Sequence, residues 1–234
     1  QINRTIFKKN KTIFTKFGSV RHFSNYFTAI DLVYRNVYET LHRTNDILEF
    51  MILIDGKKEA ALLREKLKNE VSSLKAKYNK VPGLTVILIG DLTPSQIYVR
   101  NKEKSANEVG LKSEVIKYPD SVEEKIILDK IEELNKDATV SGILVQLPLP
   151  KHIDKQKVIE TIDPSKDVDG FHPMNVGNLS SGYDSSVPCT PLGCYLLIKK
   201  IEPNLSGKKA VIVGRSNLNG KPMTQLLLKE NCTV

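Results

Sequence analysis

The chain has 234 residues, 40% of them hydrophobic, which is enough for one large or two small domains with a buried core. It has no apolar run of about eighteen residues, so we expect no membrane-spanning segment. Of its 35 Lys and Arg residues, six lie within the first 30 positions, which contain no Asp or Glu, and the remainder has 29 basic against 27 acidic residues. This nearly neutral body argues against a nucleic-acid-binding protein despite the net charge of +8.

Residues 1–50 are predicted to be a leader or extension outside the folded body, and to be disordered. The first 30 residues are rich in Arg, Lys, Ser, Thr and Phe, which is typical of a mitochondrial transit peptide. The alternative is an untargeted extension, because Met51 stands where translation of the folded part could begin. The predicted location is therefore mitochondrial or cytosolic.

Helices and strands alternate from residue 51 onward. Apolar residues recur at helical spacing between Ala60 and Leu74, which predicts an amphipathic helix. A strand over 84–90, a helix over 94–109 and a strand over 113–118 follow. This order is typical of βαβ units on a parallel sheet, and so of the α/β fold class.

The next helix is predicted to open with a capping box formed by Ser121 and Glu124, and to bury Ile127, Ile131 and Leu134. The apolar residues "VSGILVQL" predict a strand over 140–147, which the prolines of "PLP" end. A further helix is predicted over 154–162.

The segment 163–188 breaks this rhythm with many Asp, Ser, Gly, Asn and Pro residues. It is predicted to be a long loop, either joining two domains or functional in itself. Thr190 as N-cap and Pro191 at the first helical position then predict a helix. The expected domains are a catalytic α/β domain over 51–188 and the start of a Rossmann-like dinucleotide-binding domain over 189–234, incomplete in this chain.

The stretch "VIVGRSNLNG" predicts a strand, a turn and a helix opened by Gly220. Gly214 ends the strand, but Ser216 stands where the second glycine of the G-x-G-x-x-G fingerprint would be. A helix N-terminus and the guanidinium of Arg215 would both suit a phosphate. The alternative is an ordinary tight turn with a surface arginine.

Tyr98 and Lys102 lie four residues apart, so a helix places them on one face. An isolated pair of this kind is more often a half-buried tyrosine and a solvated lysine. Their helix, however, follows the carboxyl end of a strand, where ligands bind in open α/β sheets. A partly desolvated lysine there can act as an acid or a base.

Three further polar residues are candidates for a site. Gln146 lies in an otherwise apolar strand, so its amide must pair with backbone or with a ligand. No cluster of His and further carboxylates with metal-ligand spacing accompanies Asp167 and Asp169, so no metal site is expected. A single carboxylate of this pair that accepts hydrogen bonds from an amino-bearing heterocycle is the better reading, and an Asx turn is the alternative.

Taken together, these motifs resemble those of the bifunctional methylenetetrahydrofolate dehydrogenase/methenyltetrahydrofolate cyclohydrolase family. They are "YVRNK", "GILVQLPLPKHI", "KDVDGFHPMNVGNL", "PCTPLGC" and "VIVGRSNLNGKPM", in that family's order and covering roughly residues 51–234. The resemblance implies NADP-dependent oxidation of 5,10-methylene-tetrahydrofolate and hydrolysis of the 5,10-methenyl product to 10-formyl-tetrahydrofolate. NADP is the implied cofactor, with NAD possible, and a homodimer is the usual assembly.

The resemblance also implies roles for residues of the first domain. Lys102 would be the catalytic lysine of the hydrolysis step, and Tyr98 would pack on the folate and position it. Gln146 would hydrogen-bond to Lys102 and tune it, while Val145 and Leu147 would line the same pocket.

Asp169 would hold the amino edge of the pterin and complete the implied catalytic set. Gly214, Arg215 and Ser216 would bind the cofactor, the last two near its ribose phosphate. Asn219 departs from the small apolar residue expected in this turn. Two rivals remain: a Rossmann dehydrogenase for another small substrate, and a catalytically silent truncated homologue that acts through dimer contacts.

Overall fold

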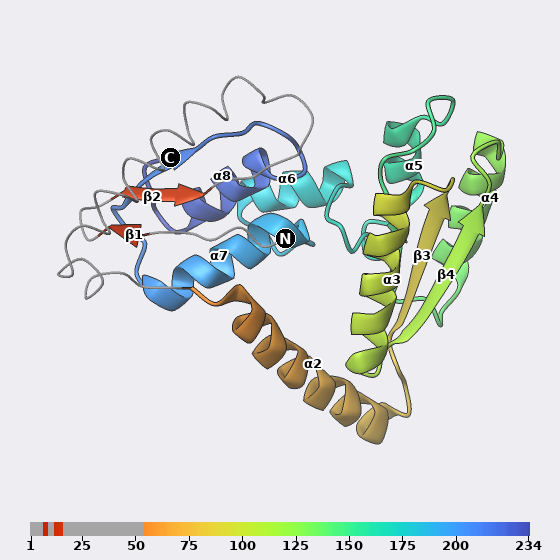
Figure 1. The fold of residues 1–234 in the computed structure, drawn as a ribbon, viewed down its shortest axis with the longest axis horizontal. Coiled ribbons are helices and arrows are strands. Elements are labelled where there is room, and N and C mark those ends of the chain that lie inside the picture. Colours follow the sequence, from red (N-terminus) through yellow and green to blue (C-terminus); the bar gives the residue numbers. More distant parts are fainter. Residues whose placement is uncertain (1–6, 9–11, 16–53) are drawn as a thin grey trace. The chain divides into compact units, whose positions relative to one another are not determined.

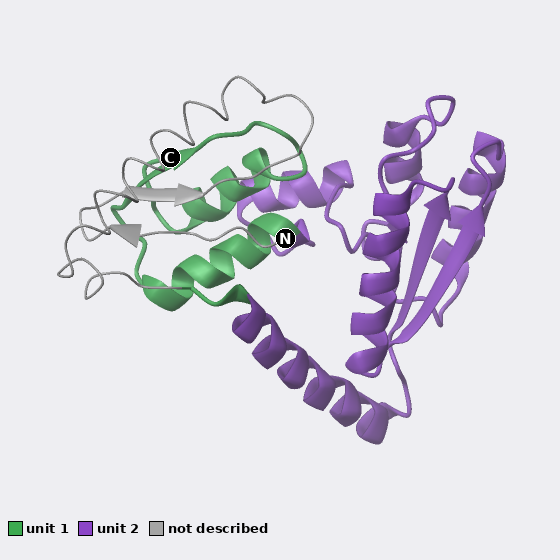
Figure 2. Cartoon of the chain, in the orientation of Figure 1, with its two compact units in different colours: residues 1–56, 190–234 green, residues 57–189 purple. Residues whose placement is uncertain are grey.

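The computed structural model describes residues 7–8, 12–15 and 54–234, and the chain divides into two units (Figure 2). The larger unit comprises residues 57–189, and the smaller unit comprises residues 1–56 and 190–234. The two are described separately below. The first boundary lies after Gly56 and the second after Cys189.

The larger unit contains a parallel sheet of three strands in the order β4-β3-β5. These strands are β3 (Gly83–Ile89), β4 (Lys112–Tyr118) and β5 (Gly142–Val145). The register pairs Ile87 with Ile116 on one side and with Val145 on the other. All three strands were predicted from their apolar runs, and the parallel α/β fold is confirmed. Only β5 is shorter than its predicted range of 140–147.

Helices cover both faces of this sheet (Figure 1). Because side chains alternate along a strand, β3 sends Val86 and Leu88 to one face, where α3 (Thr93–Glu108) contributes Val99. Ile87 and Ile89 point to the other face. There they join buried side chains of α4 (Glu124–Lys136) and α5 (Lys155–Thr161) in the main core.

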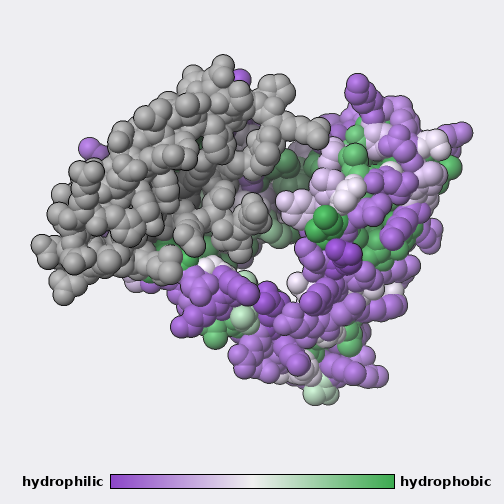
Figure 3. Space-filling model, viewed as in Figure 1, coloured by the Kyte–Doolittle hydropathy of each residue, from purple (hydrophilic) through white to green (hydrophobic). Residues whose placement is uncertain are grey.

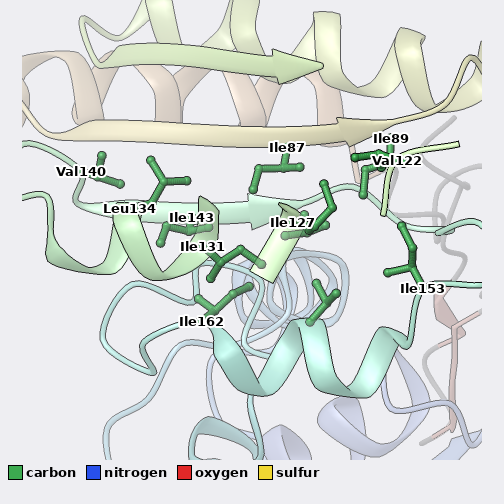
Figure 4. Close-up of a cluster of buried hydrophobic side chains, with 12 residues drawn as sticks. Ile87, Ile89, Val122, Ile127, Ile131, Leu134, Val140, Ile143, Ile153 and Ile162 are labelled. Atoms are coloured by element: carbon green, nitrogen blue, oxygen red, sulfur yellow. The ribbon is translucent and has the colours of Figure 1, made fainter. Parts of the chain in front are cut away.

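Figure 4 shows this main core, in which the labelled side chains of β3 and β5 point toward α4 and α5. The predicted stripe of α4, Ile127, Ile131 and Leu134, is buried as expected. Val158 of α5 is also fully buried. The core therefore fixes the sheet whose strand ends carry the candidate site.

The predicted capping box of α4 is wrong. The helix begins at Glu124 after an N-cap at Glu123, with no side-chain cap hydrogen bond. The Glu124 carboxylate instead accepts hydrogen bonds from the Asp154 backbone N–H and the Lys157 ammonium, both over 2.7 Å. Pairing with α5 thus replaces the local cap, because an ion pair and a backbone donor compete for the same carboxylate.

Helix α2 (Gly56–Tyr78) extends the predicted amphipathic helix at both ends. Val71 is its buried residue, while Leu63, Leu67 and Leu74 of the predicted stripe remain exposed. The visible face of the larger unit is mostly hydrophilic, with separate hydrophobic patches (Figure 3). Within the described residues, no helix is long and apolar enough to cross a membrane.

Part of the predicted loop over 163–188 is a helix, α6 (Pro173–Ser181). His172 caps it, because its ring Nδ1 accepts a hydrogen bond from the Met174 N–H over 3.0 Å, and Gly182 ends it in the left-handed conformation. The prediction failed because Asn, Ser and Gly dominate this helix. Its start was nevertheless marked by Pro173 at the first helical position.

In the smaller unit, α7 (Cys189–Ile201) packs with β6 (Lys209–Ile212) and α8 (Gly220–Lys229) around a second core. Helix α7 already begins at Cys189, so the predicted N-cap at Thr190 is wrong. Within the range expected to be a leader, β1 (Phe7–Lys8) pairs with β2 (Thr12–Thr15), which runs parallel to β6. The other residues up to 53 lie outside the described part.

Candidate functional site

The predicted lysine and glutamine meet in the larger unit. Lys102 lies on α3, one turn after the exposed Tyr98, and its ammonium donates a hydrogen bond to the Gln146 side-chain carbonyl over 3.2 Å. Gln146 directly follows β5, and its backbone N–H donates to the Ile87 carbonyl over 2.9 Å. The sheet therefore holds Gln146 in place while its amide faces the lysine.

Gln146 is oriented by a further bond, since its amide nitrogen donates to the Leu147 carbonyl over 2.8 Å. This leaves the amide oxygen as the acceptor for Lys102. Among the described residues, no carboxylate lies within ion-pairing distance of the Lys102 ammonium. A half-buried ammonium held by a neutral amide keeps its charge available to a ligand and is suited to proton transfer.

Asp169 lies in the same electrostatic environment. Burial raises the pKa of its carboxyl, the charge of Lys102 opposes this rise, and the charge of Asp167 adds to it. Asp169 therefore lies under the opposing influences of one ammonium and one further carboxylate. The structure thus brings Lys102, Gln146 and Asp169 into one region of the larger unit, with Tyr98 one turn away on α3.

A shallow hollow beside this region is lined mostly by apolar side chains of β5 and α5. Val145, Leu147 and Asp169 line it, together with Phe171, whereas Tyr98, Lys102 and Gln146 do not. Because apolar groups dominate its lining, it is a packing hollow next to the polar groups. The candidate site is therefore defined by the neighbouring polar groups of Lys102, Gln146 and Asp169, which can transfer protons or accept hydrogen bonds.

Two residues near the site were not singled out from the sequence. Phe171 shares the loop of Asp169. Cys189 is exposed as a residue, but desolvation of its thiol and then the nearby Asp169 charge raise the pKa of that thiol. Their motifs, "DGFHP" and "PCTP", were the available signals. In the described part of the chain, no group of three His, Cys, Asp or Glu side chains could hold a metal ion.

The predicted cofactor-binding residues lie in the smaller unit, in the turn between β6 and α8. Gly214 has φ of +155°, and a Cβ on Gly220 would collide with the Gly214 carbonyl oxygen, so both positions suit glycine. The Ser216 hydroxyl accepts a hydrogen bond from the Asn219 N–H over 3.1 Å. Arg215 is exposed at the turn. These features fit a phosphate-binding turn.

Comparison with known proteins identifies both parts of the chain. Residues 54–169 match the family described as tetrahydrofolate dehydrogenase/cyclohydrolase, catalytic domain. Residues 188–234 match its NAD(P)-binding domain. The two matches together cover more than half of the chain, in the order in which the sequence motifs occur.

Relatives support the same assignment. The chain is 84% identical over 184 residues to the bifunctional protein FolD of Pelagibacter ubique, covering 79% of this chain and 66% of that protein. A FolD crystal structure from Campylobacter jejuni matches with a TM-score of 0.75 at 47% identity, over 77% of this chain and 64% of that one.

A Trypanosoma brucei FolD structure, complexed with NADP cofactor and inhibitor, matches with a TM-score of 0.74 at 34% identity, over 78% of this chain and 62% of that one. The chain thus spans slightly less than two thirds of the length of these relatives. The order of the motifs and the parallel sheet agree with the family matches, and the chain belongs to the tetrahydrofolate dehydrogenase/cyclohydrolase family.

Proposed function

We propose that this protein acts in one-carbon folate metabolism as a methylenetetrahydrofolate dehydrogenase and a methenyltetrahydrofolate cyclohydrolase. It would oxidise 5,10-methylene-tetrahydrofolate with NADP and hydrolyse the methenyl product to 10-formyl-tetrahydrofolate. The observation that carries this proposal is the hydrogen bond from Lys102 to Gln146 at the end of the parallel sheet. It supplies a positioned ammonium where ligands bind in α/β folds.

The predicted substrate-binding residues of the larger unit have environments that suit their proposed roles. Tyr98 is 60% exposed, so its ring is available to pack on a flat pterin. Asp169 would accept hydrogen bonds from the pterin amino edge. Val145 and Leu147 would contribute apolar contacts beside it.

The hydrolysis step requires proton transfers, and Lys102 would perform them. A water oxygen bonds to the methenyl carbon, the bond from that carbon to N5 breaks and the formyl C=O forms; of the two water protons, one goes to N5 and the other is released to solvent. Lys102 would relay the proton between the water and the departing nitrogen. Gln146, a neutral partner, would hold the ammonium toward the reacting carbon without quenching its charge.

The dehydrogenation step depends on the orientation of two reactants. When bound, NADP supplies the acceptor for the hydride that leaves the methylene carbon. Gly214, Arg215 and Ser216 would hold this cofactor, with the Arg215 guanidinium on the phosphate of its ribose. NAD is the alternative acceptor, and the Arg215 charge favours NADP.

We further propose a homodimer in the cytosol. The relatives reported above include bacterial FolD proteins, and this supports the cytosolic alternative over the mitochondrial one. The homodimer rests on the family resemblance. Sedimentation of the purified chain would test it, and a concentration-independent monomer would contradict it.

The hydrolytic function is tested by the absorbance decay of 5,10-methenyl-tetrahydrofolate mixed with the purified full chain. We expect acceleration over the uncatalysed reaction, and a loss of at least about a hundredfold in Lys102→Met. The matched control is Lys104→Met, which removes an exposed ammonium from the same helix. A Lys102→Met protein as active as the control would contradict the role of Lys102.

A further inference from the structure

Asp167 is a buried carboxylate that the proposed mechanism does not use. Its side chain is 3% exposed, and both of its oxygens are occupied. Oδ1 accepts a hydrogen bond from the Gly170 N–H over 3.0 Å. Oδ2 accepts one from the His172 N–H over 2.8 Å and one from the Asn175 amide over 3.0 Å. Three donors on one carboxylate leave it little freedom to move.

These donors lie beyond Asp169 in the sequence, so the hydrogen bonds close the chain around that residue. Gly170 directly follows Asp169, and His172 is the N-cap of α6. Asn175 also donates to the Pro164 carbonyl over 2.9 Å, which ties α6 back to the start of the loop. Asp169 therefore lies between Asp167 and the groups that bind Asp167.

The start of this loop is fixed to the sheet. The Ile143 N–H of β5 donates to the Lys166 carbonyl over 2.8 Å, and Asp167 forms a parallel bridge with Ile143. Gly142 leaves room for Val168, whose side chain would collide with a Cβ at that position. The loop is thus anchored at the strand that also positions Gln146.

We propose that Asp167 is a positioning residue that holds the 167–172 loop so that the Asp169 carboxylate faces the folate pterin. Asp167 itself touches no substrate, because its oxygens are taken by the loop. This inference rests on the proposed function and adds a residue to it. It also gives Asp167 an electrostatic effect, since its negative charge disfavours a second charge on Asp169.

Two charged groups act on Asp169, and one titratable thiol lies close to it. The Lys102 ammonium stabilises the Asp169 carboxylate, Asp167 destabilises it, and the Cys189 thiol lies near it. Replacing Asp167 by asparagine removes the destabilising charge and should lower the pKa of Asp169. It also replaces one carboxylate oxygen by an NH₂ group, so that one donor at the Oδ1 position or two donors at the Oδ2 position lose their acceptor, which loosens the loop.

The test compares Asp167→Asn with Asp163→Asn. Asp163 is a matched control because its carboxylate caps Ser165 earlier in the same segment. We expect Asp167→Asn to raise KM for 5,10-methenyl-tetrahydrofolate about tenfold with kcat within about threefold, and to move the acidic limb of the KM profile to lower pH. The control should change neither. Asp167→Glu keeps the charge but displaces the oxygens, so it should raise KM without this pH shift.

A second measurement does not depend on turnover. The Asp169 carboxyl pKa, followed by NMR in the ligand-free chain, should fall in Asp167→Asn, and amide exchange at Gly170 and His172 should accelerate. If Asp167→Asn shows these NMR differences from the wild type but the wild type has no turnover, the proposed function fails while the positioning of the loop stands. An Asp167→Asn protein equal to Asp163→Asn in KM, pH profile and amide exchange would overturn the positioning role.

Discussion

Lys102 and Gln146, which are 44 residues apart in the sequence, are joined by a hydrogen bond of 3.2 Å between the ammonium and the side-chain carbonyl. Helix α3 supplies one partner and the end of β5 supplies the other. The bond is part of a short chain, because the Gln146 amide nitrogen donates to the Leu147 carbonyl. The lysine is thus oriented by a group that carries no charge.

Replacing this neutral partner by a charged one should impair hydrolysis. In Gln146→Glu a carboxylate of the same shape would pair with Lys102 and favour its charged form. We expect cyclohydrolase activity at neutral pH to fall at least about tenfold and its pH optimum to rise. Gln156→Glu, on the exposed face of α5, is the control and should leave the cyclohydrolase activity and its pH optimum unchanged. Equal pH profiles in the two variants would contradict the role of Gln146.

The Arg215 guanidinium should matter more for NADP than for NAD. It is exposed at the turn before α8, and only NADP offers it a ribose phosphate. We expect Arg215→Gln to raise KM for NADP about tenfold and to change KM for NAD less than about twofold. Lys229→Gln, at the other end of α8, is the control for the lost charge. A parallel loss with both cofactors would show that Arg215 does not read the phosphate.

Two glycines with positive φ allow the cost of backbone strain to be distinguished from the cost of a steric collision of an added Cβ. Gly170 has φ of +67°, and a Cβ there would lie 2.6 Å from the Ser186 carbonyl oxygen. Gly182 has φ of +81° with nothing within 4 Å of an added Cβ. We expect Gly182→Ala to lower the free energy of unfolding by about 1 kcal/mol and Gly170→Ala by about 3 kcal/mol. Urea unfolding measures both, and equal losses would contradict the collision.

Gly170→Ala should also weaken folate binding, because Gly170 adjoins Asp169 and donates its N–H to Asp167. Gly182 follows α6, outside this loop, so its variant should bind normally. Comparing KM for 5,10-methenyl-tetrahydrofolate in the two variants separates an effect on the loop from a general loss of stability.

The contribution of the main core to stability can be measured with two neighbouring isoleucines on α4. Ile127 is fully buried, whereas Ile126 is 47% exposed. We expect Ile127→Ala to lower the free energy of unfolding by about 2–5 kcal/mol, because it leaves a cavity against the sheet. Ile126→Ala should cost about 0.5 kcal/mol. Urea unfolding of both variants tests this, and similar values would mean that the helix face is assigned wrongly.

The sequence predicted those features that arise from local periodicity. Short stretches rich in apolar residues marked β3, β4 and β5, and the spacing of Tyr98 and Lys102 placed both on one helix face. The pairing of Lys102 with Gln146 was accessible only through the family resemblance, because it depends on how a helix packs on a sheet. The capping box at Ser121 failed for a related reason, since Glu124 found a partner 33 residues away in Lys157.

In the loop of Asp169, too, local features were predictable from the sequence and tertiary contacts were not. Its composition indicated turns and hid α6, whose cap is the His172 ring acting on its own helix. From the sequence, Asp167 was open to the same two readings as Asp169, an acceptor for an amino-bearing heterocycle or an Asx turn. The burial of its carboxylate and its three donors became visible only in the fold. Short-range signals thus located the functional loop but did not reveal what holds it.

The smaller unit offers a pH test of stability. The Tyr195 hydroxyl donates to the Glu230 carboxylate over 2.6 Å, and Lys199 donates to the other oxygen of that carboxylate over 2.6 Å. Burial, and then the bond to Glu230, raise the pKa of Tyr195 to about 12 from an ordinary value of 10.0. The unfolded chain therefore releases this proton at lower pH than the folded chain does.

Because the folded state holds the Tyr195 proton more tightly, stability from this group is complete below pH of about 10 and is lost as the pH rises toward about 12. We expect the free energy of unfolding to decline over this window, and Tyr195→Phe to show a shallower decline. Tyr183→Phe is the control, since Tyr183 is 69% exposed. Urea unfolding at several alkaline pH values measures the slopes. Identical slopes in all three proteins would show that the Tyr195 proton is not linked to folding.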